Sequence, residues 1–203
     1  MEKFRSVIQN LKENHRKYRW FVTSFGNLVI GGKNSDQNDS LMRDVKDTGI
    51  SFTIMHTSEP GSPFTVILAE MQDIRKQDLK ECAIFTACFS KAWKLKKKKT
   101  FIDVFSSLQL FKTKDMKKGA WSIIGQVKHV EVQLRLILIK QNGFLRAIPE
   151  NPFIDKSSKY LTIEPGKLKK EQLIPIIRET FNNISTEEIL SALPSEGFKV
   201  IKK

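Results

Sequence analysis

A loop that mixes rigid and reactive residues, from His56 to Phe64, is the first segment of this chain that could do chemistry. His56, Glu59 and Ser62 are the residue types of a general base, an orienting carboxylate and a nucleophile. No Gly-x-Ser-x-Gly pattern surrounds the serine, and nothing nearby supplies an oxyanion hole. Pro60 and Pro63 rigidify the loop, and Gly61 permits a backbone conformation closed to other residues. The loop could therefore hold backbone N–H groups and the serine hydroxyl against a phosphate or nucleotide, or form a structural turn. We favour binding over catalysis.

The second candidate is a lysine-rich stretch at residues 91–118. It holds ten lysines against two aspartates, a net charge of +8 within a chain whose net charge is +13. Such concentrated charge releases counterions when it neutralises phosphates, which makes binding tight at low salt. The stretch therefore predicts a nucleic-acid interface. The predicted phosphate contacts are Lys94, Lys96, Lys97, Lys98, Lys99, Lys112, Lys114, Lys117 and Lys118.

Aromatic residues alternate with these lysines along the chain. An exposed ring could stack on an unpaired base, whereas a buried ring would belong to the core beneath a basic surface. The sequence leaves both readings open for each ring. The residues are Phe89, Trp93, Phe101, Phe105, Phe111 and Trp121.

Composition and motifs exclude several other classes of protein. The chain has 203 residues, 40% of them hydrophobic and 28% charged, which is typical of one folded domain with or without an appendage. Its longest apolar stretches, such as Leu134–Ile139, are too short to span a membrane. The two cysteines and three histidines lack the spacing of zinc ligands, and neither a Walker motif nor Gly-x-Gly-x-x-Gly is present. We therefore expect a cytoplasmic protein without catalytic residues, metal or cofactor, and with no membrane contact.

The elements that must position these residues indicate an α+β fold of antiparallel strands and hairpins packed with helices. Helical periodicity, aromatic and β-branched runs, and turn signals such as the Asn-Gly pair at 142–143 support this pattern. The expected helices cover residues 1–15, 35–45 and 77–93. The expected strands cover residues 20–23, 27–30, 51–56 and 64–69, with several more between 100 and 148.

The composition changes near residue 150, which predicts a domain at residues 1–150 and a small helical extension at 151–203. Within the extension, Leu168–Phe181 is amphipathic but interrupted by Pro175, and Ser185 begins a capping box before a short helix. The apolar stripe of Leu168–Phe181 could dock on the rest of the chain. Alternatively, it could be exposed for a partner, which would make the protein an interaction module.

Four blocks in order resemble the NFACT-R domain family. They are Tyr18-Arg19-Trp20-Phe21 followed by Gly31-Gly32-Lys33 and Asn38; His56 followed by Pro60-Gly61-Ser62; Ser90-Lys91-Ala92-Trp93; and Lys112-Thr113-Lys114-Asp115-Met116-Lys117-Lys118-Gly119. Together they cover about residues 16–125, and their joint order and spacing make the match specific.

The resemblance implies an RNA-binding module related to the C-terminal RNA-binding domain of the RqcH/NEMF group of ribosome quality control proteins. It implies tRNA or ribosomal RNA as partner, and through the latter the large ribosomal subunit. The residues that match the family pattern add Asn38, His56, Gly61, Ser62 and Trp93 to the predicted site. Asn38 and His56 could either contact a nucleotide or stitch the fold together, and Trp93 could belong to the core. A nucleic-acid-processing enzyme centred on His56 is the least favoured alternative.

Overall fold

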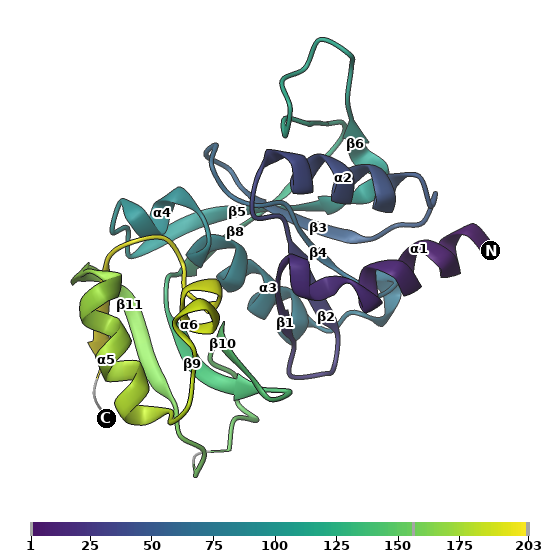
Figure 1. Ribbon diagram of the computed structural model, residues 1–203. Helices are drawn as coiled ribbons and strands as arrows, with labels where there is room; N and C mark the ends of the chain where they lie inside the picture. The colour runs from purple at the N-terminus through teal and green to yellow at the C-terminus, as the bar shows by residue number, and fades with distance from the viewer. Residues whose placement is uncertain (1, 156, 202–203) are drawn as a thin grey trace.

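The computed structural model describes residues 2–155 and 157–201, with side chains from residue 5 onward. Helices and antiparallel sheets make up the protein, which confirms the predicted α+β class (Figure 1). The α-helices are α1 (Glu2–Glu13), α2 (Ser35–Lys46), α3 (Lys76–Cys88), α4 (Lys91–Lys94), α5 (Lys170–Thr180) and α6 (Thr186–Ala192). No helix within the described ranges combines the length and the apolar content that crossing a bilayer requires.

The strands form a large sheet, a second sheet and a two-stranded ribbon. In spatial order, the six strands of the large sheet are β1 (Arg19–Val22), β2 (Leu28–Gly31), β4 (Thr65–Ile67), β3 (Thr53–Thr57), β5 (Lys99–Ser106) and β8 (Lys128–Gln133). Those of the second sheet are β10 (Phe144–Ile148), β9 (Leu136–Gln141), β11 (Leu161–Leu168) and β12 (Phe198–Ile201). The ribbon pairs β6 (Leu110–Phe111) with β7 (Ser122–Ile123).

The two faces of the large sheet bury different apolar clusters because side chains alternate along each strand. On one face, residues paired across neighbouring strands pack in one cluster with α1 and α2; they are Trp20, Ile30, Val66, Ile54 and Phe105. On the opposite face, Phe21, Val29, Met55 and Ile67 pack with α3 in a second cluster that continues into the four-stranded sheet. Helices therefore pack on both faces of the large sheet and cover part of each.

The predicted long helix at residues 77–93 is two helices. α3 ends at Cys88, and Ser90 caps α4, its Oγ accepting a hydrogen bond from the Ala92 N–H at 3.1 Å. A serine hydroxyl that accepts from a backbone N–H two residues later starts a helix, so the break has a local cause. The consequence is that Trp93 and the lysines after it lie on a separate short element.

The C-terminal segment contains the expected helices α5 and α6, but the prediction missed the strands β11 and β12. Strand β11 includes Pro165-Gly166 and a register shift between Pro165 and Leu168, so its local sequence favours a turn. It is a strand because β9 pairs with it on one side and β12 on the other. Since β9 and β10 precede residue 150, the second sheet joins both predicted regions, and their division into two domains stays a prediction.

The amphipathic helix of this segment packs on the rest of the chain. α5 runs through Pro175 without interruption, and Leu173 and Ile177 on its inner side are fully buried. Phe181 follows in the same apolar cluster. The free energy of burying these side chains outweighs the hydrogen bond that proline removes. These apolar side chains, which the sequence analysis considered as a surface for a partner protein, pack instead in the protein's own core.

Candidate nucleic-acid interface

Three segments that are distant in the sequence meet around one groove of about 640 Å³. They are the β2–α2 turn (residues 32–34) with the start of α2, the β3–β4 loop (residues 58–64) beside His56, and the last residues of the β6–β7 loop (117–121). Each segment carries one of the motif blocks found in the sequence. We call this the basic groove, because its lining includes the cations Arg19, Lys33, Lys117 and Lys118.

The β2–α2 turn fixes one wall of the groove. Asn34 caps α2, and its Oδ1 accepts a hydrogen bond from the Gln37 N–H at 2.9 Å. Gly32 is needed because a Cβ there would lie 2.2 Å from Asn38 Oδ1. That same oxygen accepts from the Phe64 N–H at 3.3 Å, which ties α2 to the opposite loop. Two roles were predicted for Asn38, nucleotide contact and stabilisation of the fold. The structure shows a stabilising hydrogen bond at the edge of the groove.

The β3–β4 loop is held by its own backbone and by α4. Gly61 adopts a φ of +112°, and its carbonyl accepts a hydrogen bond from the Lys91 N–H at 2.8 Å. The Ser62 Oγ accepts from the Thr57 N–H at 2.9 Å. Thr57 Oγ1 in turn donates to the carbonyl of Glu59 at 2.6 Å. Gly61 and Ser62 therefore shape the loop, as its proline-rich sequence predicts.

His56 lines the groove but is not arranged as the base of a catalytic pair. Its ring packs against that of Phe64, with the centroids 4.5 Å apart, and its Nδ1 lies 2.7 Å from the carbonyl of Thr57. Among the described residues no hydrogen bond joins the ring to the Ser62 hydroxyl. Burial lowers the pKa of His56 below its ordinary value, although the Thr57 carbonyl, Asp103 and the Ser62 backbone oppose the shift. A largely neutral, half-buried imidazole suits contact with a base or sugar more than an ionic contact with phosphate.

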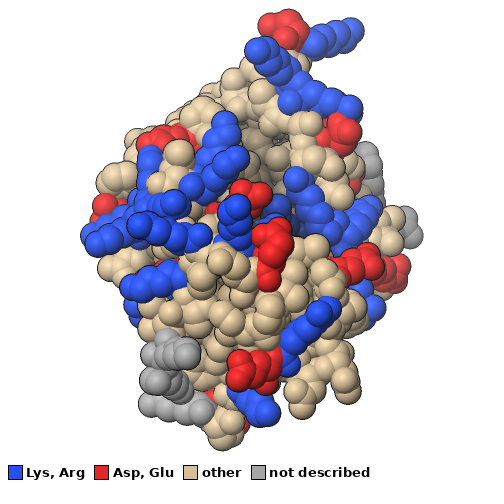
Figure 2. Space-filling model, turned by 60° about the vertical axis from the view of Figure 1, so that its left-hand side comes forward, with Lys and Arg blue, Asp and Glu red and all other residues tan. Residues whose placement is uncertain are grey.

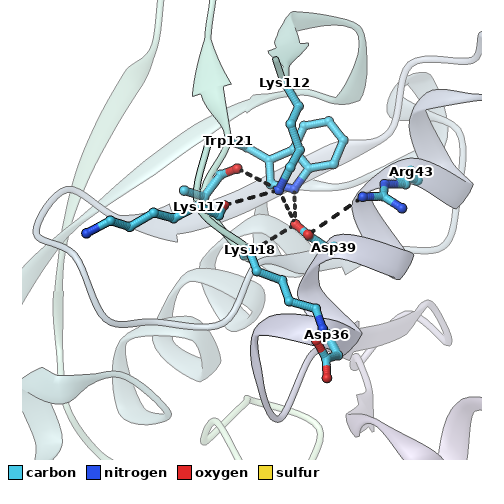
Figure 3. Close-up of polar contacts among 9 residues, drawn as sticks. Asp36, Asp39, Arg43, Lys112, Lys117, Lys118 and Trp121 are labelled. Atoms are coloured by element: carbon cyan, nitrogen blue, oxygen red, sulfur yellow. Dashed lines mark hydrogen bonds and ion pairs between the residues drawn. The ribbon is translucent and has the colours of Figure 1, made fainter. Parts of the chain in front are cut away.

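Asp39 anchors the β6–β7 loop to α2 (Figure 3). This carboxylate accepts hydrogen bonds from Lys112 Nζ at 2.7 Å, from Trp121 Nε1 at 2.9 Å and from the Gly119 N–H at 3.0 Å. Burial alone would raise the pKa of Asp39, but these bonds hold it below its ordinary value. The loop projects beyond α2 (Figure 1), and Asp39 keeps its base in place.

The anchoring changes the role of one predicted phosphate contact. The Lys112 side chain is only 13% exposed, and its ammonium also donates to the carbonyls of Lys117 and Ala120. The charge of Lys112 is therefore neutralised by Asp39 within the protein and is not available to a phosphate. The Lys118 side chain is exposed and paired with Asp36, while Lys117 extends away from the cluster (Figure 3). Lys114 is exposed farther along the same loop.

Arg19 and Lys33 are site residues that were not among the predicted contacts. Arg19 lies half-buried in the groove, with its guanidinium 4.8 Å from the ring centroid of Phe89. No carboxylate of the described residues forms an ion pair with either cation. Burial lowers the pKa of Arg19, and burial together with Arg19 and Arg146 lowers the pKa of Lys33. Unpaired, partly desolvated cations that repel one another favour a bound anion.

The residues after Trp93 form a second basic surface, which we call the lysine loop (Lys94 to Lys99). Lys96 turns the chain with a φ of +56°, and the Lys98 carbonyl accepts from the Leu134 N–H at 3.0 Å. Lys97 pairs with Glu59 of the β3–β4 loop at 2.7 Å, which connects the lysine loop to that wall of the basic groove. Lys99 pairs with Glu131 at 2.9 Å, and the other three lysines are exposed. Figure 2 shows lysine and arginine side chains gathered over the upper part of one face, with acidic side chains among them.

Trp93 lies beneath the lysine loop rather than on the surface. Its side chain is fully buried, and its Nε1 donates to the carbonyl of Gly197 at 2.8 Å. Its ring packs near that of Phe198, with the centroids 5.9 Å apart. The sequence left Trp93 between core and site. The structure places it in the core, where it holds the C-terminal strand, and no base can reach it there.

No cluster of metal-ligating side chains is found among the described residues. Across residues 2–155 and 157–201, His, Cys, Asp and Glu side chains form no group of three or more that could hold an ion. Both cysteines are buried, and burial raises the pKa of the Cys82 thiol to about 12. The site offers cations, fixed backbone groups, a neutral imidazole and aromatic rings. These groups bind phosphates and bases.

The fold and the basic groove thus define a candidate nucleic-acid-binding module, and comparison with known families agrees. The family described as the NFACT protein RNA binding domain matches residues 17–125. This chain belongs to that family. The matched range includes all three walls of the basic groove and the lysine loop.

One relative extends the match to almost the whole chain. The Archaeal Rqc2 homolog aRqcH of Methanocaldococcus jannaschii is 28% identical over 209 aligned residues, which include 97% of this chain and 30% of the relative. This chain therefore spans less than a third of the length of that relative. Among solved structures, the C-terminal part of the fibronectin/fibrinogen-binding protein from Streptococcus suis is similar in fold. It has a TM-score of 0.50 and 22% identity, over 58% of this chain and 45% of the other.

Proposed function

We propose that this protein binds RNA by placing the phosphate backbone along the basic groove and the lysine loop. The observation that carries the proposal is the half-buried guanidinium of Arg19, which lines the groove without a carboxylate partner in the described part of the chain. A phosphate would supply the missing negative charge. Membership of an RNA-binding family supports RNA over other polyanions.

The proposed target is tRNA or ribosomal RNA, in a context of ribosome quality control. The likeness to an archaeal Rqc2 homolog supports this context. Through ribosomal RNA, the partner would include the large ribosomal subunit, and the protein would act in the cytoplasm. The proposed role is binding without catalysis, because His56 and Ser62 both direct hydrogen-bonding groups toward the backbone of their own loop.

The test is binding of labelled total tRNA by a variant in which Lys33 and Lys117, both exposed at the groove, become alanine. Each lost phosphate contact should lower the slope of log K against log salt by about 0.7 to 0.9. A matched variant at Lys12 and Lys80 removes the same charge from exposed positions outside the groove. We expect weaker binding from the first variant and nearly parental binding from the second. An equal loss of tRNA affinity in both variants would mean that the whole surface attracts polyanions, and it would contradict the proposal.

A further inference from the structure

Four phenylalanines among the described side chains are exposed, and three of them have partners. Phe25 and Phe153 pack against each other, with centroids 5.4 Å apart, and the guanidinium of Arg75 lies over the ring of Phe25. Lys46 lies 5.9 Å from the ring centroid of Phe111. Phe101 is 53% exposed and has no ring or cation contact within the described part of the chain. The face of this ring is therefore free to stack on a planar ligand.

Phe101 lies on an uncovered part of the large sheet. Side chains two residues apart on a strand share a face, so Phe101 lies on the same face as Phe105. Phe105 is buried in the cluster formed with α1 and α2, whereas Phe101 is open to solvent. The helical layer therefore ends between these two residues of β5. Beyond its edge, this face of the sheet exposes the ring of Phe101.

Polar and charged groups surround this ring. The carbonyl of Phe101 accepts a hydrogen bond from the Ser58 N–H at 3.1 Å, which places the ring's strand beside the β3–β4 loop. On the same face, Asp103 accepts from the Ser58 hydroxyl, and the His129 ring lies 2.8 Å from the same carboxylate. In the opposite direction, Lys99 is the next residue on this face, and its ammonium is paired with Glu131, the β8 residue opposite Phe101. The ring thus has hydrogen-bonding groups on one side and an exposed lysine–glutamate ion pair on the other.

We propose that Phe101 is a stacking platform for an unpaired nucleobase, an inference that rests on the proposed RNA-binding function. The base lies on the exposed ring, with its polar edge toward Asp103 and His129. The flanking phosphates lie toward Lys99 and Lys97, whose exposed ion pairs with glutamates exchange readily with solvent. Because a base inside a duplex cannot reach the ring, the platform selects single-stranded segments, loops or flipped nucleotides.

The test compares Phe101→Val with the parent protein on two probes. One is a short single-stranded RNA with 2-aminopurine at a central position, and the other is a fully paired RNA hairpin of equal phosphate number. Valine keeps a strong preference for strands but has no π face, so the sheet is preserved. Phe101→Trp is the conservative variant, and Phe153→Val removes another exposed ring as a matched control. Thermal melting verifies that each variant is folded.

We expect Phe101→Val to weaken single-strand binding about fivefold to 150-fold, which corresponds to the stacking free energy of one base. The quenching of 2-aminopurine should be lost, while the salt slope and the hairpin affinity stay at parental values. Phe101→Trp and Phe153→Val should both behave as the parent. Unchanged quenching and affinity in Phe101→Val would overturn the platform while leaving the proposed function intact. Absence of binding to either probe by the parent would overturn both.

Discussion

The basic groove and the lysine loop both carry dense positive charge, but they hold it in different ways. Beside the groove, Lys112 is mostly buried in an ion pair that fixes the loop of one wall, and Arg19 lines the groove half-buried, without an ion pair to a described carboxylate. In the lysine loop, Lys94, Lys96 and Lys98 are exposed, without ion pairs to described carboxylates. Fixed and partly desolvated cations define where a phosphate sits, whereas mobile exposed ones add attraction that salt screens. The comparison shows that a count of lysines does not measure how much charge is available to a ligand.

The largest expected effect comes from breaking the anchor of the groove with Asp39→Ala. The variant would leave a buried ammonium without its carboxylate, since the side chains of Lys112 and Asp39 are 13% and 8% exposed. Loss of one partner of a buried pair typically lowers the free energy of unfolding by about 3–5 kcal/mol. We expect a loss of that order in urea denaturation at pH 7.

The matched control for this variant is Asp36→Ala on the same helix. Asp36 pairs with Lys118, and both side chains are about two-thirds exposed. An exposed pair contributes less than about 1 kcal/mol, so this variant should unfold close to the parent. If the two variants lost equal stability, the distinction between the buried and the exposed ion pair would fail.

A smaller effect is expected from pH, through His56 in the groove wall. Burial lowers its pKa below the ordinary value of 6.5, so below that pH the unfolded chain binds a proton more readily than the folded protein. The stability contribution is present above pH 6.5 and is lost as pH falls toward the folded-state pKa. We expect the free energy of unfolding to decrease by up to about 1 kcal/mol between pH 7.5 and 5.5.

The control for the pH effect is His56→Gln, which removes the titrating ring and retains the other two histidines. Urea denaturation at both pH values should give a smaller difference for this variant than for the parent. Identical pH dependence in the two proteins would mean that His56 is not desolvated, and the account of this groove wall would be wrong.

Much of the fold could be predicted from local signals. The Asn142-Gly143 pair forms a hairpin turn with both residues at positive φ, and Ser185 caps α6 through its hydroxyl. β11 and β12 could not be predicted, because their strand structure depends on pairing with β9 and with each other. The helix expected at residues 35–45 is α2, and the side chain of Asn34 caps its start.

The candidate site was also predicted only in part, because local signals locate its loops but not the contacts between them. Motif blocks located its three walls, since each block is a local turn or loop. The internal use of Lys112 was not visible, because its partner Asp39 is 73 residues away in the sequence. Arg19 was missed because the absence of a carboxylate partner is a property of the folded surroundings. Trp93 and Phe101 looked alike in the sequence, and only the packing separates the buried ring from the exposed one.

The most direct test of RNA binding by this surface is a salt titration of tRNA binding, with duplex DNA as competitor. It compares the parent with a triple alanine variant at Lys94, Lys96 and Lys98. The matched control is a triple at Lys12, Lys80 and Lys140, which are also exposed and lie outside the lysine loop and the basic groove. The account predicts a parental slope that corresponds to about five or more phosphates and a preference for tRNA over DNA. It also predicts that the slope falls by about 2–3 in the lysine-loop variant, with unchanged melting. A parent that binds both polymers equally, or a lysine-loop variant with the parental slope, would contradict it.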